Sequence, residues 1–400
     1  MKFGILKELK SPPDRRVVFS PDALLELQKQ YPDFLVQIES SETRIFSDQS
    51  YIDAGFEVVT DLSDCDVLIG IKEMPVANVL DNKTYFFFSH TIKKQAANRA
   101  LLQAILEKNG TLYDHEAIVN QENRRLIGFG GYAGFVGAYN SIRAFGTKYG
   151  LFNLPKPSTL SGKAQMIGYL KRIVLPPLKF VITGKGKVGN GVIEILKVLK
   201  VKEVTKENFL TKKYAQSVFV QLGVADYTKK STDGSFDFDD FVQNPNDYES
   251  DFEQFTQVSD IYLAGHFHAI GAPNILTVAM LQSKDCQLKI VADISCDLDG
   301  SIACSLRKST NDAPFYGYLP SKNEEVDIFH PAALVVMAVD NLPSELPLDA
   351  SIGFGEMFCT HVMPAFFNND KDGVLERAKI SQNGKLTPRF EYLQDYVGGN

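Results

Sequence analysis

The sequence has few cysteines, and they show no pattern of a disulfide framework or a metal site. There are five among 400 residues, an odd number, and they are scattered without a C-x-x-C pair. A chain of this length can bury a sizeable core without disulfides or metal. Free thiols in a reducing compartment are the simplest interpretation, and we expect a cytoplasmic protein.

Long apolar runs and basic clusters are also missing. The longest uninterrupted apolar run, residues 332–339, is far shorter than the roughly 20 residues that a membrane helix needs. The N-terminus, MKFGILKEL, has no apolar signal core. The formal net charge is −7, with no long cluster of Lys and Arg. We therefore expect neither a membrane nor a nucleic acid as a partner.

A glycine-rich stretch dominates what is present. Residues 178–196 read LKFVITGKGKVGNGVIEIL, in which a short apolar run precedes Gly184, Gly186 and Gly189 in the spacing G-x-G-x-x-G, and helical periodicity follows. Strand, glycine turn and helix in this order are the context of a dinucleotide-binding fingerprint. The glycines allow the tight turn, the approach of a pyrophosphate and close strand–helix packing. The alternative is a close-packed strand–helix turn that binds nothing.

The residues before this stretch alternate strand and helix signals. We expect strands at 3–6, 34–38, 67–71, 84–88 and from 112, and helices from 21 to 27 and from 95 to 108. Such alternation predicts a parallel sheet with helices on both sides. A glycine- and aromatic-rich helix at 131–145 then leads into a second domain.

The second domain opens at the fingerprint, after a Pro- and Ser-containing linker. We expect its linker at 151–162, its second strand at 201–205, further buried strands at 261–263 and 288–292, and a helix at 273–281. An acidic insertion near 211–257 reads as solvated, because residues 231–260 contain no Lys or Arg.

A last helix at 349–367 is expected to return to the first domain. The prediction is therefore an α/β protein of two doubly wound, Rossmann-like domains with a cleft between them. The first domain comprises residues 1–135 and about 345–400, and the dinucleotide-binding domain comprises residues 136–344.

Two side chains at strand ends are candidates for acid–base chemistry. Lys72 ends one apolar strand and His90 follows the next, and ligands of parallel sheets bind beyond the carboxyl ends of strands. Desolvation lowers the pKa of a lysine, and histidine titrates near neutrality. The alternative for Lys72 is a solvated charge at a strand end, and the alternative for His90 is a structural histidine.

Other charged residues are weaker candidates. Arg16 and Arg125 have guanidinium groups that suit carboxylates and diphosphates, although each alone reads as a surface charge. His266 and His268 are two imidazoles without a third ligand nearby, so we expect no metal. Asp293, Asp297 and Asp299 follow a buried strand where a cofactor would lie, or they simply favour a turn.

Six segments of the chain carry a resemblance to a known family: IGIKEMP at 69–75, FFFSHTIKKQ at 86–95, GTLYDHE at 110–116, RRLIGFGGYAGFVGA at 124–138, VADISCDLDGSI at 291–302 and VDNLPSELPLDAS at 339–351. With these segments the chain resembles the lysine-forming saccharopine dehydrogenases and the lysine–ketoglutarate reductase half of bifunctional lysine-degrading enzymes. These belong with alanine dehydrogenase and proton-pumping transhydrogenase.

The resemblance implies an NAD(P)-dependent oxidoreductase that acts on an amino acid C–N bond. Saccharopine would be oxidised reversibly to L-lysine and 2-oxoglutarate, with Lys72 and His90 as the catalytic acid–base pair. The implied substrate-binding residues are Arg16, Gln95 and Phe129. The implied cofactor-binding residues are Arg125, Gly184, Gly186, Lys187, Gly189, Asp293, Ile294 and Ser295.

Three questions stay open at the sequence level. The acid that binds the adenosine ribose is expected ~20 residues after the glycines, where Thr205, Lys206 and Glu207 stand. Glu207 would favour NAD, and a lysine could face the 2′-phosphate of NADP. The rival functions are an alanine dehydrogenase-like enzyme and a non-catalytic nucleotide sensor, and the protein could be a monomer or a dimer.

Overall fold

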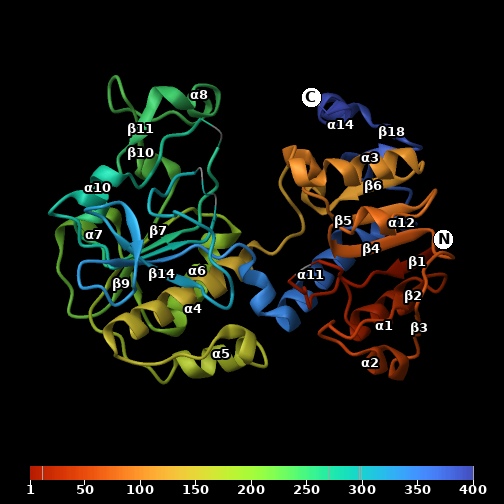
Figure 1. The fold of residues 1–400 in the computed structure, drawn as a ribbon, viewed down its shortest axis with the longest axis horizontal. Helices are drawn as coiled ribbons and strands as arrows, with labels where there is room; N and C mark the ends of the chain where they lie inside the picture. Colours follow the sequence, from red (N-terminus) through yellow and green to blue (C-terminus); the bar gives the residue numbers. More distant parts are fainter. Residues whose placement is uncertain (11, 270, 297, 299, 400) are drawn as a thin grey trace. The chain divides into compact units, whose positions relative to one another are not determined.

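The structure is a computed structural model that describes residues 1–10, 12–269, 271–296, 298 and 300–399. The chain forms two compact units, and each is an α/β unit built on an eight-stranded, mostly parallel sheet (Figure 1). Unit 1 comprises residues 1–129 and 347–400, and unit 2 comprises residues 130–346. The prediction of two Rossmann-like α/β domains is confirmed at the level of fold class.

The sheet of unit 1 has the strand order β18-β17-β6-β5-β4-β1-β2-β3. Its strands are β1 (Lys2–Ile5), β2 (Leu35–Glu39), β3 (Glu57–Val59), β4 (Val67–Lys72), β5 (Thr84–Phe88), β6 (Thr111–Asp114), β17 (Lys379–Gln382) and β18 (Lys385–Leu386). The first six are parallel, and β17 and β18 are antiparallel additions from the C-terminal part of the chain. The sequence pattern predicted β1, β2, β4, β5 and β6, but it missed the short β3, β17 and β18.

The helices of unit 1 begin and end where the local sequence requires. They are α1 (Pro21–Gln30), α2 (Asp48–Asp53), α3 (Arg99–Glu107), α11 (Pro347–His361), α12 (Met363–Phe367), α13 (Val374–Ala378) and α14 (Gln394–Gly398). Ser20 caps α1 through its side chain. The single helix expected at 349–367 is wrong, because α11 ends at His361 and α12 starts before Pro364, whose missing N–H cannot continue the helix.

The helix expected at 95–108 starts later than predicted. Its first residues instead form two short 3₁₀ turns, Thr91–Lys93 and Ala96–Asn98. His90 and Lys94 have left-handed backbone conformations, with φ of 55° and 54°, which end regular helical structure on either side of the first turn. His90 is thus presented on an irregular segment directly after β5.

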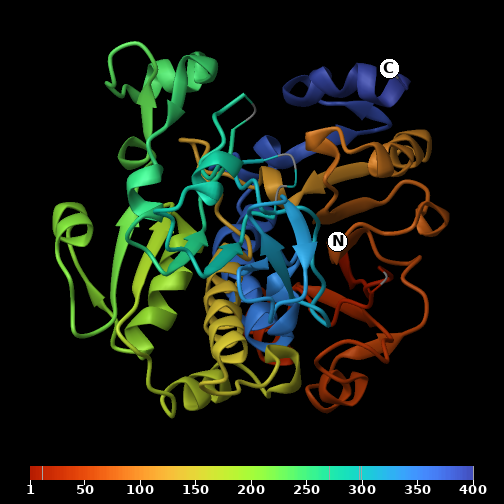
Figure 2. The same ribbon diagram turned by 60° about the vertical axis from the view of Figure 1, so that its left-hand side comes forward.

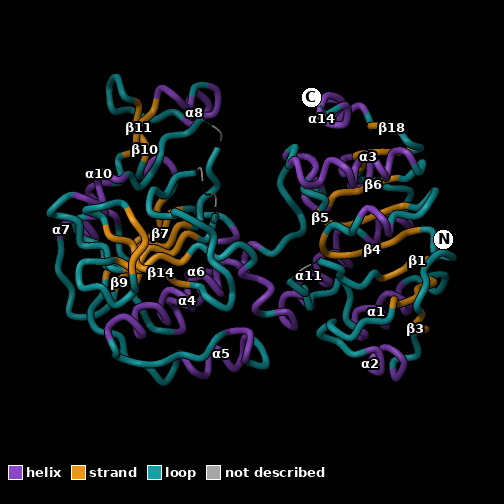
Figure 3. Tube along the Cα trace, in the orientation of Figure 1, coloured by secondary structure: helices purple, strands orange, loops and turns teal. Residues whose placement is uncertain are grey.

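The sheet of unit 2 has the strand order β15-β14-β16-β13-β12-β7-β9-β8. Its strands are β7 (Lys179–Thr183), β8 (Lys202–Glu203), β9 (Val218–Leu222), β12 (Ile261–Ala264), β13 (Ile290–Asp293), β14 (Phe315–Leu319), β15 (Glu324–Val326) and β16 (Leu334–Met337). The expected second strand is therefore a two-residue edge strand, and β9 lies between it and β7. Figure 3 shows the strands of each sheet side by side.

The helices α4 (Gly130–Tyr149) and α6 (Lys187–Val198) pack backbone against backbone in unit 2. A Cβ added at Gly134 would lie 2.8 Å from the carbonyl carbon of Val188, and one added at Gly191 would lie against the carbonyl oxygen of Gly131. Glycine is required at both positions because no side chain fits. The whole of α4 belongs to unit 2, so the unit begins at Gly130 rather than inside the helix.

The region predicted as an acidic insertion contains part of the sheet. Strand β9 lies inside the range 211–257, and its side chains Val218, Val220 and Leu222 are buried, so the additional segment begins after Leu222. It is built from β10 (Thr228–Lys230), β11 (Tyr248–Ser250), α8 (Phe238–Gln243) and α9 (Glu253–Thr256). Figures 1 and 2 both show β10, β11 and α8 standing apart from the sheet at one end of unit 2.

Three further helices complete unit 2, namely α5 (Lys163–Leu170), α7 (Lys206–Thr211) and α10 (Val278–Gln282). The sequence reasoning missed α5, and the helix expected at 273–281 is reduced to α10. The apolar run at 332–339 contains the buried strand β16. In the part of the chain that the structure describes, no helix is both long enough and apolar enough to cross a membrane.

Candidate active site

In unit 1 the predicted catalytic residues lie at the point where the strand order reverses. The chain runs from β1 outward to β2 and β3, and then returns to place β4 on the other side of β1. Ligands of open parallel sheets bind at such a switch point, beyond the carboxyl ends of the strands. Lys72 ends β4, His90 follows β5, and the loop after β1 carries Glu8, Lys10 and Asp14.

Lys72 is partly buried among charged groups. Burial lowers its pKa first, and the positive charges of Arg16 and Lys10 lower it further, against the opposing effect of Glu73. A lowered pKa increases the neutral fraction of an amine near pH 7, and only the neutral amine can accept a proton. The environment of Lys72 therefore suits proton transfer.

Glu73 links Lys10 to His90. One of its carboxylate oxygens, Oε1, lies 2.6 Å from Nζ of Lys10, and the other, Oε2, lies 3.3 Å from Nδ1 of His90. Despite burial, these partners hold the pKa of Glu73 at about 2, so it is a carboxylate at neutral pH. A carboxylate at this distance from an imidazole nitrogen can orient the ring.

Glu8 holds the end of β4 in place. Its carboxyl oxygens accept hydrogen bonds from the backbone N–H of Ile71 and of Lys72, at 2.7 and 2.9 Å. Burial raises the pKa of Glu8 to about 8. Because the bonded N–H belongs to Lys72 itself, Glu8 fixes the position from which that side chain starts.

Arg16 is fixed by an acid and an aromatic ring. Nε and Nη2 of its guanidinium donate to the two carboxylate oxygens of Asp14, at 2.9 and 2.6 Å. The guanidinium also lies over the Phe129 ring, 4.3 Å from the centroid, and Phe129 stacks on Phe354. Arg16 is 2% exposed, so the surface charge considered as its alternative interpretation is wrong. Its role toward a substrate carboxylate stays a prediction.

A second charged group lies past the ends of β5 and β6. Glu116 binds Nη2 of Arg125 at 2.5 Å and Nζ of Lys93 at 2.9 Å. The buried carboxylate of Asp114 accepts hydrogen bonds from the hydroxyl and the backbone N–H of Ser89, and burial raises its pKa to about 6. Gln95 is exposed in the loop after β5. The substrate and cofactor roles of Gln95 and Arg125 stay predictions.

In unit 2 the glycine turn has the shape that a dinucleotide requires. Gly184 has φ of +99°, and a Cβ there would lie 2.5 Å from the carbonyl oxygen of Gly265. A Cβ at Gly189 would strike the carbonyl oxygen of Gly184, whereas one at Gly186 would meet nothing within 4 Å. The first and third glycines are thus packed against neighbouring backbone, whereas the second leaves free space beside the backbone. The twelve-residue helix α6 begins directly after it, at the exposed Lys187, so a pyrophosphate fits here.

The residues at the end of β13 form an internal network. Asp293 is fully buried, and its oxygens accept hydrogen bonds from the hydroxyls of Ser295 and Ser305, both at 2.6 Å, and from the backbone N–H of Cys296 at 3.0 Å. Ile294 packs against Gly137 of α4. Asp293 therefore shapes the turn here, and direct cofactor contacts of Asp293, Ile294 and Ser295 stay predictions. Asp297 and Asp299 lie outside the described residues.

The adenosine end of the expected site follows β9. The sequence reasoning placed the ribose acid after the second strand in the chain, but the strand that pairs with β7 is β9. The acid beyond its end is Asp226, which lies 3.1 Å from Nζ of Lys206 and 3.7 Å from Nζ of Lys185. These three residues line a groove of about 700 Å³ at the ends of β8 and β9, which Glu207 does not line. Asp226 rather than Glu207 is thus the acid that lies in this groove.

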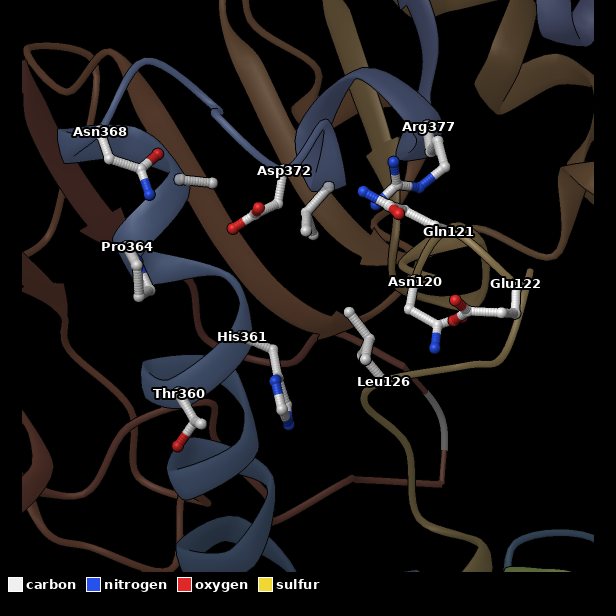
Figure 4. Close-up of a pocket in the computed structure, with 12 residues that line it drawn as sticks. Asn120, Gln121, Glu122, Leu126, Thr360, His361, Pro364, Asn368, Asp372 and Arg377 are labelled. Carbon is white, nitrogen blue, oxygen red and sulfur yellow. The ribbon is translucent and has the colours of Figure 1, made fainter.

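Two features of the described residues lie outside this scheme. His266 is buried, with its ring nitrogens hydrogen bonded to Thr183 and Ser301, and no cluster of three possible metal ligands occurs among the described residues. A hollow of about 330 Å³ in unit 1 (Figure 4) lies between the loop after β6 and the C-terminal helices. None of the predicted site residues lines it.

The sequence reasoning missed several acids that surround the predicted residues. Lys72 and His90 were identified from strand ends, and Arg16 and Arg125 from their guanidinium groups and the resemblance, but the acids around them were not. These acids are Glu8, Asp14, Glu73 and Glu116, with Asp114 bound to the neighbouring Ser89. Asp14 and Glu73 could have been suspected, because they lie within two residues of Arg16 and Lys72.

Comparisons with known proteins agree with this fold. Residues 4–136 match the family model of the alanine dehydrogenase/PNT N-terminal domain. Alpha-aminoadipic semialdehyde synthase of Arabidopsis thaliana is 31% identical over 98% of this chain and 41% of that protein. Saccharopine dehydrogenase (NAD(+), L-lysine-forming) of Neurospora crassa is 25% identical over 85% of both chains. A solved L-alanine dehydrogenase matches 99% of this chain and 100% of its own, with a TM-score of 0.66 and 16% identity.

The fold is that of L-alanine dehydrogenase, and residues 4–136 carry the alanine dehydrogenase/PNT N-terminal domain. By sequence the chain is similar to the alpha-aminoadipic semialdehyde synthases and to the saccharopine dehydrogenases. It spans less than half the length of the alpha-aminoadipic semialdehyde synthases that it matches, 41% of the plant protein and 46% of the rat protein.

Proposed function

We propose that this protein catalyses the reversible NAD(P)-dependent oxidation of saccharopine to L-lysine and 2-oxoglutarate. The observation that carries the proposal is the cluster of Lys72, Glu73 and His90 at the switch point of unit 1. A lysine with a lowered pKa beside a carboxylate–imidazole pair supplies two different proton-transfer groups. Formation and hydrolysis of an imine require two such groups.

The roles of the side chains follow from their environments. Toward saccharopine, the ε-amine of the substrate lysine attacks the keto carbon of 2-oxoglutarate, and Lys72 accepts the proton that the amine loses. His90, oriented by Glu73, donates a proton to the departing hydroxyl so that water leaves. A nicotinamide dinucleotide held at the turn of Gly184, Gly186 and Gly189 would supply the hydride that reduces the imine. We assign Arg16, whose guanidinium also binds Asp14 and lies over the Phe129 ring, to a substrate carboxylate, as the resemblance implies.

The test is an assay with two substrate pairs. Oxidation of NADH or NADPH is followed with 2-oxoglutarate plus lysine, and separately with pyruvate plus ammonia. We expect turnover with the first pair, and turnover only with the second pair would reject the proposal. Lys72→Met should abolish most of the activity, whereas Lys29→Met, which alters an exposed lysine of α1, should leave it unchanged.

An alanine dehydrogenase-like activity is the second candidate. It is supported by the likeness of the whole fold to a solved L-alanine dehydrogenase, and the same acid–base pair would serve a smaller imino acid. The number of charged groups favours the larger substrate. Saccharopine carries three carboxylates, and four cations of unit 1, each paired with an acid, lie on loops after its parallel strands: Lys10, Arg16, Lys93 and Arg125.

For the cofactor we propose that NADPH binds more tightly than NADH. The groove after β9 is lined by Lys185, Lys202, Lys206 and Lys212 against Glu203 and Asp226. The two carboxylate oxygens of Asp226 are already engaged by Lys206 and by the backbone N–H of Gly223, at 3.1 and 2.8 Å. An acid so engaged is poorly disposed to bind a ribose hydroxyl, while its lysine partners can bind a 2′-phosphate.

We retain a cytoplasmic location as a proposal. It is supported by the cysteines, all five of which are free thiols, with three of them buried. Cell fractionation with an antibody to the native protein tests it, and recovery in an organelle fraction would contradict it.

A further inference from the structure

The loop after β12 lies directly against the glycine turn of unit 2. The backbone N–H of Gly265 donates to the carbonyl oxygen of Thr183 at 3.0 Å. A Cβ added at Gly184 would lie 2.5 Å from the carbonyl oxygen of Gly265 and 2.9 Å from Cα of His266. The residues that follow Gly265 are therefore at the rim of the nucleotide turn.

His266 clamps this loop from inside the protein. Its Nδ1 lies 2.7 Å from the hydroxyl of Thr183 at the end of β7, and its Nε2 lies 2.6 Å from the hydroxyl of Ser301. The ring is 7% exposed and faces Tyr227 at a centroid distance of 6.1 Å. Burial lowers the pKa of His266 to about 3, so this clamp is neutral and does not titrate near pH 7.

The next residue, Phe267, exposes its side chain to solvent. It is 89% exposed, the highest value among the large apolar side chains of the described residues. A Cβ added at Gly271 would lie 3.3 Å from Cγ of Pro245 in the additional segment. An exposed aromatic ring directly after the hydrogen-bonded His266 offers apolar area for a ligand contact.

The topology decides which half of a dinucleotide this ring would meet. The chain runs from β7 outward to β8 and β9, and then crosses back to β12 and β13, so the switch point lies between β7 and β12. A dinucleotide spans such a crevice, with its pyrophosphate at the glycine turn. The groove with Asp226 lies on the β9 side, which leaves the β12 side for the nicotinamide.

We propose that Phe267 is a positioning residue for the nicotinamide ring. Its side chain lies against the nicotinamide ring and shields that ring from water. The proposal rests on the proposed function, because it requires that unit 2 bind a nicotinamide dinucleotide. Neither the family resemblance nor the glycine fingerprint assigns a role to Phe267.

The test compares ligands with and without the nicotinamide ring. Calorimetry measures the binding of NADH and NADPH, and of ADP-ribose with and without a 2′-phosphate, to the whole protein and to Phe267→Ala. We expect the affinity for the reduced dinucleotide to fall roughly tenfold, as expected for loss of an aromatic stacking contact. The affinity for ADP-ribose should not change, because that ligand lacks the nicotinamide ring.

Two matched variants identify the cause. Phe267→Tyr should restore dinucleotide affinity, because it keeps the ring. Phe329→Ala removes another exposed aromatic ring of the same unit, which is 61% exposed. It should change the affinity for neither ligand. Unchanged dinucleotide binding by Phe267→Ala would overturn the proposal, and so would an equal loss for both ligands, which would indicate a structural effect. If the unaltered protein binds neither ligand, the proposed function itself is wrong.

Discussion

The glycine contact between α4 and α6 gives a prediction for which a second glycine of α4 serves as the control. In Gly134→Ala, the new methyl group would lie 2.8 Å from the carbonyl carbon of Val188 and 3.0 Å from the backbone nitrogen of Val192, and still closer to the carbonyl oxygen of Val188. All three atoms are backbone atoms of the first two turns of α6, so no side chain can rotate away. Gly131→Ala adds the same methyl group to the same helix with nothing within 4 Å.

The expected magnitudes have opposite signs for the two variants. Overpacking that displaces backbone typically costs about 1–3 kcal/mol, and replacing glycine by alanine in a helix contributes up to about 1 kcal/mol of stability. Gly134→Ala should therefore be destabilised by about 1–2 kcal/mol, and Gly131→Ala should be stabilised slightly. For a unit of this size, each kcal/mol of difference in stability shifts the unfolding temperature by about 2–4 °C.

Differential scanning calorimetry of the whole protein measures this difference. The transition of unit 2 should fall by several degrees in Gly134→Ala and should not fall in Gly131→Ala. Because α6 starts at the glycine turn, the same variant should also weaken binding of NADH or NADPH. An unfolding temperature of Gly134→Ala equal to that of Gly131→Ala would refute the argument that the two backbones are in contact.

Three further predictions concern charge. Lys72→Met should lower kcat by about 10²–10⁴-fold, the usual contribution of a general acid–base group, and a value within twofold of the unaltered enzyme would remove Lys72 from the mechanism. Lys206→Ala should raise the Kd for NADPH tenfold or more while changing that for NADH little; equal changes for both would contradict the proposed 2′-phosphate contact. Glu345 is buried, and burial raises its pKa to about 7 from an ordinary 4.5. A raised pKa in the folded chain stabilises the protein fully below pH 4.5, and this stabilisation is lost as pH rises to 7, by about 3 kcal/mol at most. Denaturant unfolding should therefore show that the free energy of unfolding of the unaltered protein falls between pH 4.5 and 7 relative to that of Glu345→Gln. A difference in free energy that stays constant over this pH range would contradict the raised pKa.

The candidate residues of the active site were predictable because strand ends are visible in the sequence. Apolar runs end at Lys72 and before His90, and the carboxyl ends of parallel strands share one edge of a sheet. The glycine turn was predictable for a similar reason, since its spacing reflects local backbone geometry. The partners of these residues were not predictable. Asp14 and Arg16 are close in sequence, but Glu8 meets the end of β4 only because β1 and β4 are neighbours in the sheet.

The order of strands in unit 2 was not accessible from the sequence. The acid of the adenosine ribose was expected at the end of the second strand in the chain, where Thr205, Lys206 and Glu207 stand. The structure places β9 beside β7 and β8 at the edge, so Asp226 takes that position. No periodicity reveals this, because β8 and β9 both carry short strand patterns and either could pair with β7.

The sequence by itself determined several local elements of this protein, namely most of the parallel strands of unit 1, the glycine turn and the charged residues at two strand ends. These depend on contacts between residues that are near each other in the chain. The tertiary structure alone decided which acid meets which base, where α4 touches α6, and which strand borders β7. These are contacts between residues far apart in the chain, and they are set by packing and by strand order rather than by local preference.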